Sequence, residues 1–548
     1  MTTNRRRKDT RPSNSSGVEA PDVVLRDIDN AQISQTKTFH RKVKTMKDHR
    51  NRIQHVCDFI HEKYPQYSAT MVRRLNIVDY GNSEKHFFTS THDIKYASLS
   101  ADIVLAFMGT KKNKGDGKIM SHVHIRKFHD ALMFGAKEAR VGFSEQYYMT
   151  VDGFLDNYRK EYADAKKHGN VDEEEADPIS FNLFEMLCFW FLCSGNIFAW
   201  FFMMCCWNFM ARTINVDGIG FRHITKGTDS IKVKYFGTKA DQEGKNCTHK
   251  NIYANPFNPK VCFVTGMGVY FALNASVLAT RYTFFLRTGA KEGTASSNFC
   301  RFLGDVIQKY KVIVETHLRL DHANAHGIRK GSGTHSTSCT TSPPSLVAVA
   351  LRGDWSMGKI FDTYFTFGDF GDQYLGRILA GLNPSKPTFA TLPPHFTVSI
   401  DECAELTEGM RCMYGPIMDF HPGCHGILLL CLASVVYHSD FLKDVSSKMS
   451  GHPLLTLPIL NNESLLQKLK TLVVLESDTI VPSGVPPHVE HIKLLERVFL
   501  LVQDSVKLLR EQVHNINGAV CDAIISNDLR SGSLSLNTLE VSIYLLLI

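Results

Sequence analysis

The sequence lacks both a cysteine pairing pattern and a secretory signal. Its 14 cysteines have no paired spacing, and several lie in apolar runs such as MMCCW, as is typical of free thiols in an intracellular protein. The basic segment TNRRRKD is followed by the polar TRPSNSSG, where a signal peptide needs an apolar stretch. A secreted, disulfide-stapled protein is therefore not expected. The basic cluster suits a nuclear-import signal and a disordered tail equally well.

A large excess of either charge is also missing. The 548 residues carry a formal net charge of +7, and 43% are hydrophobic while 21% are charged. This balance is ordinary for a soluble protein with sizeable cores, and the length favours two or three domains. Mildly basic charge is compatible with a nucleic-acid partner but does not require one.

No long apolar run is uninterrupted. Residues 181–210 are rich in apolar side chains, but Glu185, the breaker SGN at 194–196 and Asn208 divide them. Each half is about ten to fourteen residues, short of the ~20 that a membrane span needs. We expect two buried helices joined by a turn, with a membrane helix as the less favoured alternative and no membrane partner.

Composition predicts the domain organisation. Residues 1–30 are expected to be a disordered basic tail, and 31–175 a helical, basic N-terminal domain that ends in the charged stretch KKHGNVDEEEADP. Residues 176–380 should form a second domain, followed by a helical C-terminal region over 381–548. Between Ile231 and Pro256, alternating apolar residues and bracketing glycines predict a β-hairpin with Lys239 at or near its tip. The fold class is thus mainly α with a small β-hairpin or sheet (α+β).

Basic and aromatic residues form a set in the second domain. HGIRKGSGTH, at 326–335, places two cations and a histidine on consecutive turns of an expected short helix. Alone, this pattern is most simply a solvated basic face; in a larger set it suits a grip on an anion. Arg212 ends an apolar helix, where arginine is unusual unless a carboxylate or another anion meets it. In chain order the set is Arg212, Lys239, His326, Arg329, Trp355 and Tyr364.

The order and spacing of this set resemble the catalytic domain of tyrosine recombinases, the phage-integrase family of DNA breaking and rejoining enzymes. MARTINVDGI, GTKADQEG, IYANPFNP, HGIRKG, LRGDWSMGKIFDTYF, GDQYLGR and LPPHF are most similar to the Crypton group, mobile elements that encode such a recombinase. The resemblance covers roughly residues 100–440. It implies a nuclear protein in which a helical, SAM-like core-binding domain and a mainly helical catalytic domain close as a C-shaped clamp around duplex DNA.

The resemblance also implies a nucleophile and an acid. Tyr364 would attack a phosphodiester and form a 3′-phosphotyrosine bond, which keeps the energy of the broken linkage for rejoining without ATP. Its phenol has an ordinary pKa of about 10, so neighbouring groups must accept its proton. Lys239 would protonate the 5′-hydroxyl that leaves.

The remaining residues of the set would bind the phosphate. Arg212 and Arg329 would hold the non-bridging oxygens through their guanidinium groups. His326 would assist proton movement or donate a hydrogen bond to the phosphate, and Trp355 would donate its indole N–H. We expect no metal and no other cofactor, because the guanidiniums neutralise the charge that Mg²⁺ neutralises elsewhere.

Several assignments have alternatives. Arg212 could pair with Asp217, and Asn215 stands where many family members carry an acid, which leaves the orientation of Arg212 open. Trp355 could be a plain core residue. Tyr374, ten residues beyond Tyr364, is a rival nucleophile. The rival lysines of the hairpin are Lys232, Lys234 and Lys245.

Other basic and metal-binding patterns carry less information. Arg126 and Lys127 lie either on a solvated helix face or on an arm that contacts DNA phosphates, and Lys330 is a further expected DNA contact. A zinc site is possible in principle, but its spacing fits no standard finger, so a local core and loop are favoured. The residues that such a site would use are Cys403, Cys412, His421, Cys424 and His425.

The C-terminal region contains a heptad pattern. Eight apolar residues between 492 and 516 alternate three and four apart, as in the a and d positions of a coiled coil. The alternatives are a self-association seam, which would suit a homo-oligomer on DNA, and an amphipathic helix packed on its own domain. The residues are Ile492, Leu495, Phe499, Val502, Val506, Leu509, Val513 and Ile516.

These features predict a site-specific recombinase or integrase that acts on double-stranded DNA to move a Crypton-like element. Two other classes remain open. A domesticated DNA-binding structural protein would have lost catalysis, and a type IB topoisomerase would share the chemistry but relax supercoils without pairing two sites.

Overall fold

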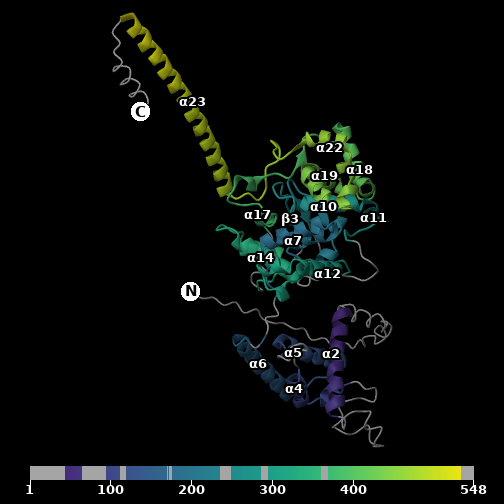
Figure 1. Cartoon of the computed structure of the whole chain (residues 1–548). Helices are drawn as coiled ribbons and strands as arrows, with labels where there is room; N and C mark the ends of the chain where they lie inside the picture. Colours follow the sequence, from purple (N-terminus) through teal and green to yellow (C-terminus); the bar gives the residue numbers. More distant parts are fainter. Residues whose placement is uncertain are drawn as a thin grey trace, which may run out of the picture. The chain divides into compact units, whose positions relative to one another are not determined.

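The computed structural model describes residues 43–64, 94–111, 119–169, 171, 176–234, 248–285, 294–358 and 368–531. Within these residues the chain is mainly helical, with a three-stranded and a two-stranded antiparallel sheet, which agrees with the predicted fold class (Figure 1). The chain divides into two compact units, residues 1–174 and 175–548. The division falls beside the domain boundary predicted from the charged stretch before Pro178.

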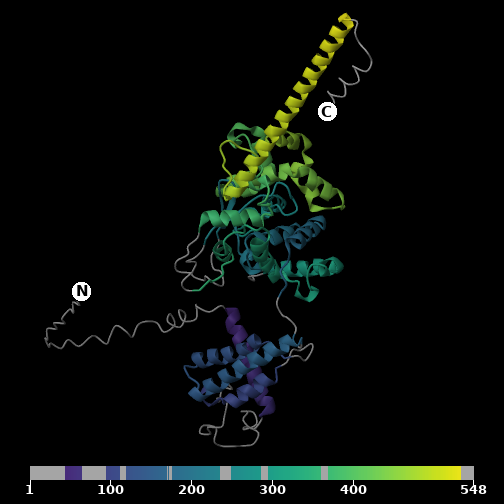
Figure 2. The same ribbon diagram turned by 90° about the vertical axis from the view of Figure 1, so that its left-hand side faces the viewer.

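The described residues of the first unit form a bundle of helices around one apolar core (Figure 2). Ser100 and Ser144 cap two of these helices, since their hydroxyls accept hydrogen bonds from backbone N–H groups two and three residues on. Phe128 lies in the core, with its ring edge-on to that of Phe107 at 5.1 Å. The helices are α2 (Val43–Lys63), α4 (Ala101–Gly109), α5 (His122–Glu138) and α6 (Glu145–Lys167), with a short η2 (Tyr96–Ser98) before α4.

The second unit is built around the apolar segment at 181–210. It forms two helices, α7 (Phe181–Cys193) and α8 (Ile197–Asn208), joined at Gly195, whose φ of 72° suits the turn. The prediction of two buried helices is confirmed, because α8 is almost wholly enclosed by other helices. No single described helix is both long and apolar enough to cross a membrane, although one bent pair, Pro422–Tyr437 with Ser439–Ser447, has the necessary length and composition.

The small sheet contains the predicted hairpin. Strands β2 (Ile231–Val233) and β3 (Lys250–Ile252) pair antiparallel, with Ile231 opposite Ile252, and β1 (Ile224–Lys226) adds a third strand beside β2. Lys239, in the connection between β2 and β3, lies outside the described residues. The sheet packs against helix α17 (Asp369–Leu379).

The remaining elements complete this unit. The helices are α9 (Thr213–Asp217), α10 (Phe263–Leu273), α11 (Ala275–Ala279), α12 (Thr294–Lys309), α13 (Lys311–Glu315), α14 (Ala325–Ser338), α15 (Leu346–Arg352), α18 (Ala404–Phe420), α19 (His425–Tyr437), α20 (Ser439–Ser447), α21 (Pro458–Asn461), α22 (Glu463–Lys470) and α23 (Pro487–Ser531). The 3₁₀ turns are η3 (Phe221–His223), η4 (Leu320–His322), η5 (Pro387–Ala390), η6 (Ile400–Glu402), η7 (Pro422–Cys424) and η8 (Pro453–Thr456), and the second sheet joins β4 (His395–Phe396) to β5 (Val473–Val474).

The expected division between residues 380 and 381 is absent from the core. Helices α18 to α22 share one continuous cluster of buried side chains with α7, α8 and α10. The Tyr414 hydroxyl donates to the carbonyl of Gly268, where an added Cβ would lie 3.0 Å from the Cys431 carbonyl. The described part of 381–486 therefore belongs to the same folded body as 176–380.

Helix α23 differs from the rest of the unit. Val489 in its first turn is buried and Ile492 is half-buried, and from Leu494 on its large apolar side chains are exposed, including Phe499 at 61% and Ile516 at 60%. Figures 1 and 2 both show one uninterrupted helix. The predicted helix over 492–516 is present, and its heptad face is not packed on the described residues of its own domain.

Candidate active site

The first residue of the set follows the end of α8. Met210 takes a left-handed conformation, with φ at 50°, and the turn places Arg212 at the first residue before α9. Nη1 of Arg212 is buried and has no hydrogen-bond partner among the described residues. Asp217, the alternative structural partner, accepts a hydrogen bond from the backbone N–H of Ala295 at 3.2 Å. A half-buried guanidinium with an unused donor is suited to an anionic ligand.

Helix α14 presents the second group. Asn324 caps its start, where Oδ1 accepts from the backbone N–H of His326 at 2.9 Å. Gly327 and Gly331, one turn apart, let the helix lie directly on the extended segment 177–179, because a Cβ at either position would collide with that backbone. The repeated glycines of HGIRKGSG thus serve close packing on one face, and Arg329 lies buried in the same helix.

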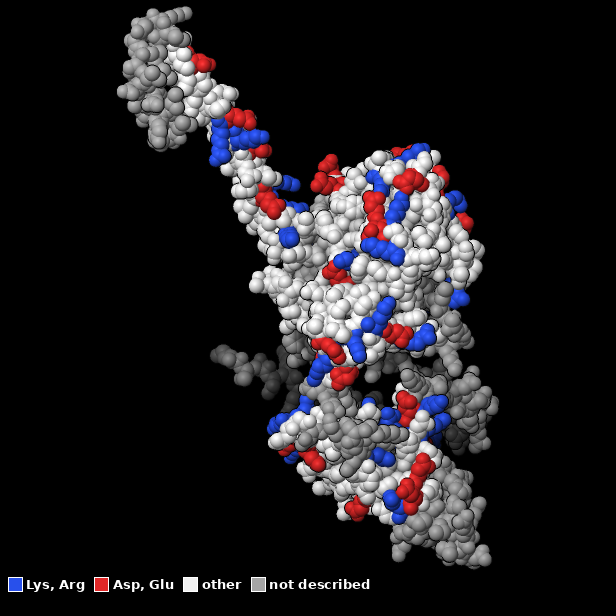
Figure 3. All heavy atoms as spheres, viewed as in Figure 1, with Lys and Arg blue, Asp and Glu red and all other residues white. Residues whose placement is uncertain are grey.

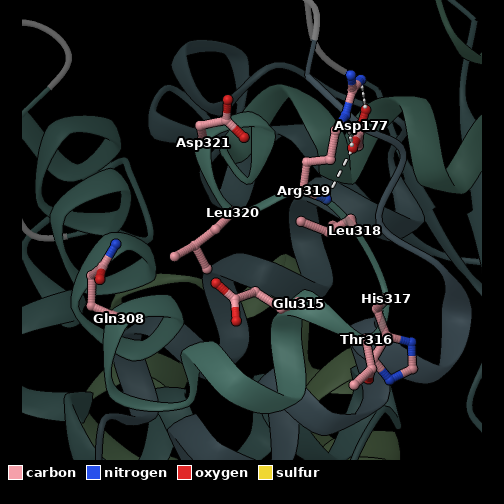
Figure 4. Close-up of a pocket in the computed structure, with 9 residues that line it drawn as sticks. All are labelled: Asp177, Gln308, Glu315, Thr316, His317, Leu318, Arg319, Leu320 and Asp321. Carbon is pink, nitrogen blue, oxygen red and sulfur yellow. Dashed lines mark hydrogen bonds and ion pairs between the residues drawn. The ribbon is translucent and has the colours of Figure 1, made fainter.

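An ion pair fastens the chain before α14. Asp177 accepts hydrogen bonds from the backbone N–H and Nε of Arg319 at 3.1 Å, and from Nη2 at 2.8 Å (Figure 4). These bonds hold the pKa of Asp177 at about 2. The carboxylate also lies 3.7 Å from Nδ1 of His322. This pair lines an open cleft of about 840 Å³ and fixes the loop that leads into α14.

Trp355 lies directly beside Arg329. The chain turns after α15 through Asp354, whose φ is 51°. The backbone N–H of Trp355 closes this turn by donating to the carbonyl of Ala350 at 2.9 Å. Nη2 of Arg329 donates to the carbonyl of Gly353, and its Cζ lies 5.6 Å from the centre of the Trp355 ring. The indole remains 39% exposed, so it is not a plain core residue.

The two turns meet over one glycine of α14. A Cβ at Gly333 would lie 2.8 Å from the Trp355 ring and 3.6 Å from the terminal methyl of Met210. Because Met210 precedes Arg212 by two residues, the turns that bear Arg212 and Trp355 are neighbours. The structure therefore brings the segment around 210 together with those around 329 and 355, which lie more than a hundred residues further along the chain.

The positive charge of Arg212 also acts on His326. Partial burial is the largest cause that lowers the pKa of His326, and the positive charges of Arg212, Arg329 and Lys330 lower it further. Burial first, and the nearby cations second, thus favour the neutral form of the imidazole. In that form an exposed ring can accept a proton or donate one hydrogen bond to a phosphate.

Tyr364 and Lys239 lie outside the described residues. The rival nucleophile Tyr374, in α17, donates its hydroxyl to the carbonyl of Ser342 at 2.5 Å and lies near Cys339, which caps the C-terminal end of α14. His326 is at the opposite end of that helix, thirteen residues or about 20 Å away. Tyr374 is thus remote from the His326 end of the group.

The rival hairpin lysines have different surroundings. Nζ of Lys232 lies 3.4 Å from the carboxylate of Asp369, Lys234 is exposed, and Lys245 lies outside the described residues. Lys250, which sequence analysis did not single out, is 2% exposed and donates to two backbone carbonyls. Its burial signals a structural task rather than contact with a substrate.

The expected DNA-contact residues are on the surface. Arg126 and Lys127 of α5 and Lys330 of α14 are exposed. On the face drawn in Figure 3, lysine and arginine are interspersed with acidic residues and form no single broad patch. Local groups of cations, and not a uniformly basic surface, are therefore the available anion sites on this face.

The possible zinc ligands do not gather. His421 stacks on Phe221 at 4.0 Å, and Nε2 of His425 is 3.1 Å from the carbonyl of Met418. Among the described residues, no three His, Cys, Asp or Glu side chains are arranged to hold a metal ion. The cysteines of the described part are all free thiols.

No family model matches the chain, and a search of curated proteins finds no relative. The functional interpretation consequently depends on the geometry of the site and on the resemblance of its motifs.

Proposed function

We propose that the chain is a DNA strand-cleaving and rejoining enzyme of the tyrosine recombinase type, of the kind that Crypton-like mobile elements encode. The observation that supports this most is the grouping of Arg212, His326, Arg329 and Trp355 from three distant segments. Two guanidiniums, an imidazole and an indole N–H form a site for a phosphate that gains negative charge during reaction.

In this proposal the two arginines bind the non-bridging oxygens of one phosphodiester. The unused Nη1 donor of Arg212 supplies a contact that its own surroundings leave open. Arg329 is buried and fixed by Gly353 and Trp355, so its guanidinium loses little freedom when substrate binds. His326 and the indole N–H of Trp355 donate further hydrogen bonds as charge develops.

The covalent step uses residues of the motif that the resemblance identifies. The Tyr364 oxygen attacks phosphorus, its proton passes to a neighbouring group such as His326, and a phosphotyrosine bond forms as the P–O5′ bond breaks. Lys239 gives its proton to the departing 5′-oxygen. The reverse sequence rejoins strands, because the phosphotyrosine retains a linkage that a 5′-hydroxyl can attack.

Duplex DNA is the proposed partner of both units. Exposed cations on the first unit, including Arg126 and Lys127, would contact the backbone of a duplex whose scissile phosphate lies at the candidate site, so that the units together clamp the DNA. Binding should therefore weaken steeply with salt as counterions are released. Affinity that is unchanged between low and physiological salt would contradict this clamp.

We propose that the protein is located in the nucleus and that α23 mediates its assembly on DNA. The a positions of α23 are largely β-branched and its d positions include Leu495, Leu509 and Ile516, a pattern that stabilises helix association. The seam is exposed in the single chain, so a second copy can cover it. Strand exchange requires protomers on two sites, whereas a topoisomerase acts on one.

A nicked suicide duplex tests the proposal. The duplex contains the DNA that flanks the gene and a nick near the candidate cleavage position, so that the cut strand diffuses away and traps the covalent complex. A labelled protein–DNA band should survive denaturation in the presence of EDTA and disappear in Tyr364→Phe. A non-catalytic binder would give no band, and a topoisomerase would give the band without joining two duplexes.

A further inference from the structure

A buried cluster of polar side chains lies beneath the two turns of the candidate site. Its cations are Lys250, at the start of β3, and Arg352, at the end of α15, and both are nearly inaccessible to solvent. Asp372 of α17 forms an ion pair with Arg352, with Nη1 and Oδ1 2.6 Å apart. Buried cations are rare unless each of their N–H donors has an acceptor, so the acceptors of Lys250 and Arg352 show which parts of the backbone the cluster fixes.

The targets are carbonyls at helix ends. Nζ of Lys250 donates to the carbonyl of Arg352 at 2.8 Å and to that of Phe209 at 3.3 Å. Arg352 itself donates through Nε and Nη2 to the carbonyl of Asn208, at 3.1 and 2.9 Å. The last carbonyls of α8 and α15 have no partners within their own helices, and they carry the negative ends of the helix dipoles. A cation at these helix ends donates hydrogen bonds to the carbonyls and compensates the negative ends of the dipoles.

These carbonyls adjoin the two strained residues of the site. Phe209 directly precedes Met210, and Arg352 lies two residues before Asp354, whose carboxylate is 3.6 Å from Nζ of Lys250. Met210 and Asp354 are two of the three described residues other than glycine with positive φ. Such a conformation is sterically unfavourable for an L-residue, so surrounding contacts must maintain it. One ammonium group thus contacts the peptide before each left-handed turn.

We infer that Lys250 is a positioning residue that fixes the turns bearing Arg212 and Trp355 in register with Arg329. This inference rests on the proposed function, because the register matters only if the three side chains act on one phosphate. Lys250 does not touch substrate, because its ammonium group is enclosed and faces two backbone carbonyls and the Asp354 carboxylate. Its replacement should misplace two phosphate ligands together.

The test compares Lys250→Met with Lys260→Met in the full chain. Lys260 is a matched control, since it is a half-buried lysine of the same unit paired with Glu185 at 3.0 Å, away from both turns. Two suicide duplexes are used, one with an ordinary phosphodiester and one with a 5′-bridging sulfur, whose thiolate leaves without a proton. Lys250→Met should slow adduct formation about 100-fold on both, because small displacements of catalytic groups cost about that much. Duplex affinity should change less than about twofold, and Lys260→Met should match the wild type.

The sulfur substrate separates positioning from proton donation. Equal slowing on both duplexes supports positioning, whereas rescue by sulfur would make Lys250 an acid and overturn the inference. A Lys250→Met protein that cleaves within about threefold of wild type would overturn it too. If the wild type forms no adduct at all, the proposed function fails instead.

Hydrogen exchange keeps the inference testable without activity. In Lys250→Met the amides of 210–213 and 353–356 should exchange at least about tenfold faster, while those of α10 keep their protection. Unchanged exchange in both turns would refute the positioning role. If Lys250→Met does not fold, Asp354→Asn serves in its place: asparagine tolerates the left-handed conformation but removes the carboxylate facing Lys250, so the same amides should exchange faster to a smaller extent.

Discussion

Replacing Arg329 with alanine is the sharpest test of the phosphate site, because a loss of cleavage rate and a loss of stability are both expected and each has its own assay. One end of the guanidinium binds the carbonyl of Gly353, and its plane lies near Trp355. In the proposed function the same guanidinium binds a non-bridging phosphate oxygen. Arg329→Ala removes the internal contact and the catalytic contact together.

The expected loss follows from those contacts. A preorganised donor to a developing oxyanion is worth about 3–4 kcal/mol, which lowers the cleavage rate by about two to three orders of magnitude. The bond to Gly353 is a hydrogen bond to a charged group, so its loss lowers the free energy of unfolding by about 1.5–3 kcal/mol. The variant should therefore fold, with a lower midpoint of thermal unfolding, and cleave slowly at temperatures where it is fully folded.

The assay is single-turnover formation of the covalent band on the nicked duplex, with denaturant unfolding measured in parallel. Arg411→Ala is the control, since Arg411 is an exposed cation 3.5 Å from Asp419, and an exposed pair contributes at most about 1 kcal/mol. Arg329→Lys keeps the charge but not the planar fork, so its rate should lie between those of alanine and arginine. A folded Arg329→Ala protein that forms adduct within fivefold of the wild type would refute the phosphate role.

Four further outcomes are expected. Tyr364→Phe should bind duplex with near-normal affinity and form no adduct, whereas Tyr374→Phe should retain it; the denaturing gel measures both, and an adduct in Tyr364→Phe would exclude that nucleophile. Lys239→Ala should slow cleavage of the oxygen substrate while sparing the 5′-bridging sulfur, and equal slowing would move the acid to another residue. Burial and nearby cations lower the pKa of His326, and a bound phosphate should raise that pKa again. Duplex binding below pH 6.5 should therefore be accompanied by proton uptake, which calorimetry in buffers of different ionisation enthalpy measures. Proton uptake that persists in His326→Gln would contradict this expectation. The full chain should sediment as an oligomer at tens of micromolar, and placing charged residues at Leu495 and Leu509 should make it monomeric; a wild type that is already monomeric would remove the seam.

Local patterns in the sequence predicted the elements that local physics controls. The apolar segment broken at Gly195 predicted α7 and α8, and alternation after Ile231 predicted the hairpin strands. The a/d spacing after Ile492 predicted a helix, and its exposed face excludes packing on the described part of its own domain.

Long-range partners could not be predicted in the same way. LRGDW reads as a short motif, yet Arg352 is buried because its partners are Asn208 and Asp372. No sequence period connects these residues, and burial of a cation is decided only when distant helix ends meet. Lys250 could not be identified from the sequence for the same reason, because no local pattern distinguishes the inward-facing lysine from the other lysines of a basic hairpin.

The fastening of α14 has a mechanical consequence. The segment that begins at Asp177 continues directly from the stretch joining the two units, and its first contacts are with Arg319, His322 and Gly327. A tensile load applied at Asp177 is therefore borne first by the guanidinium of Arg319 and the backbone of His322, which directly precede α14. Pulling there acts on the segment that begins the helix of His326 and Arg329.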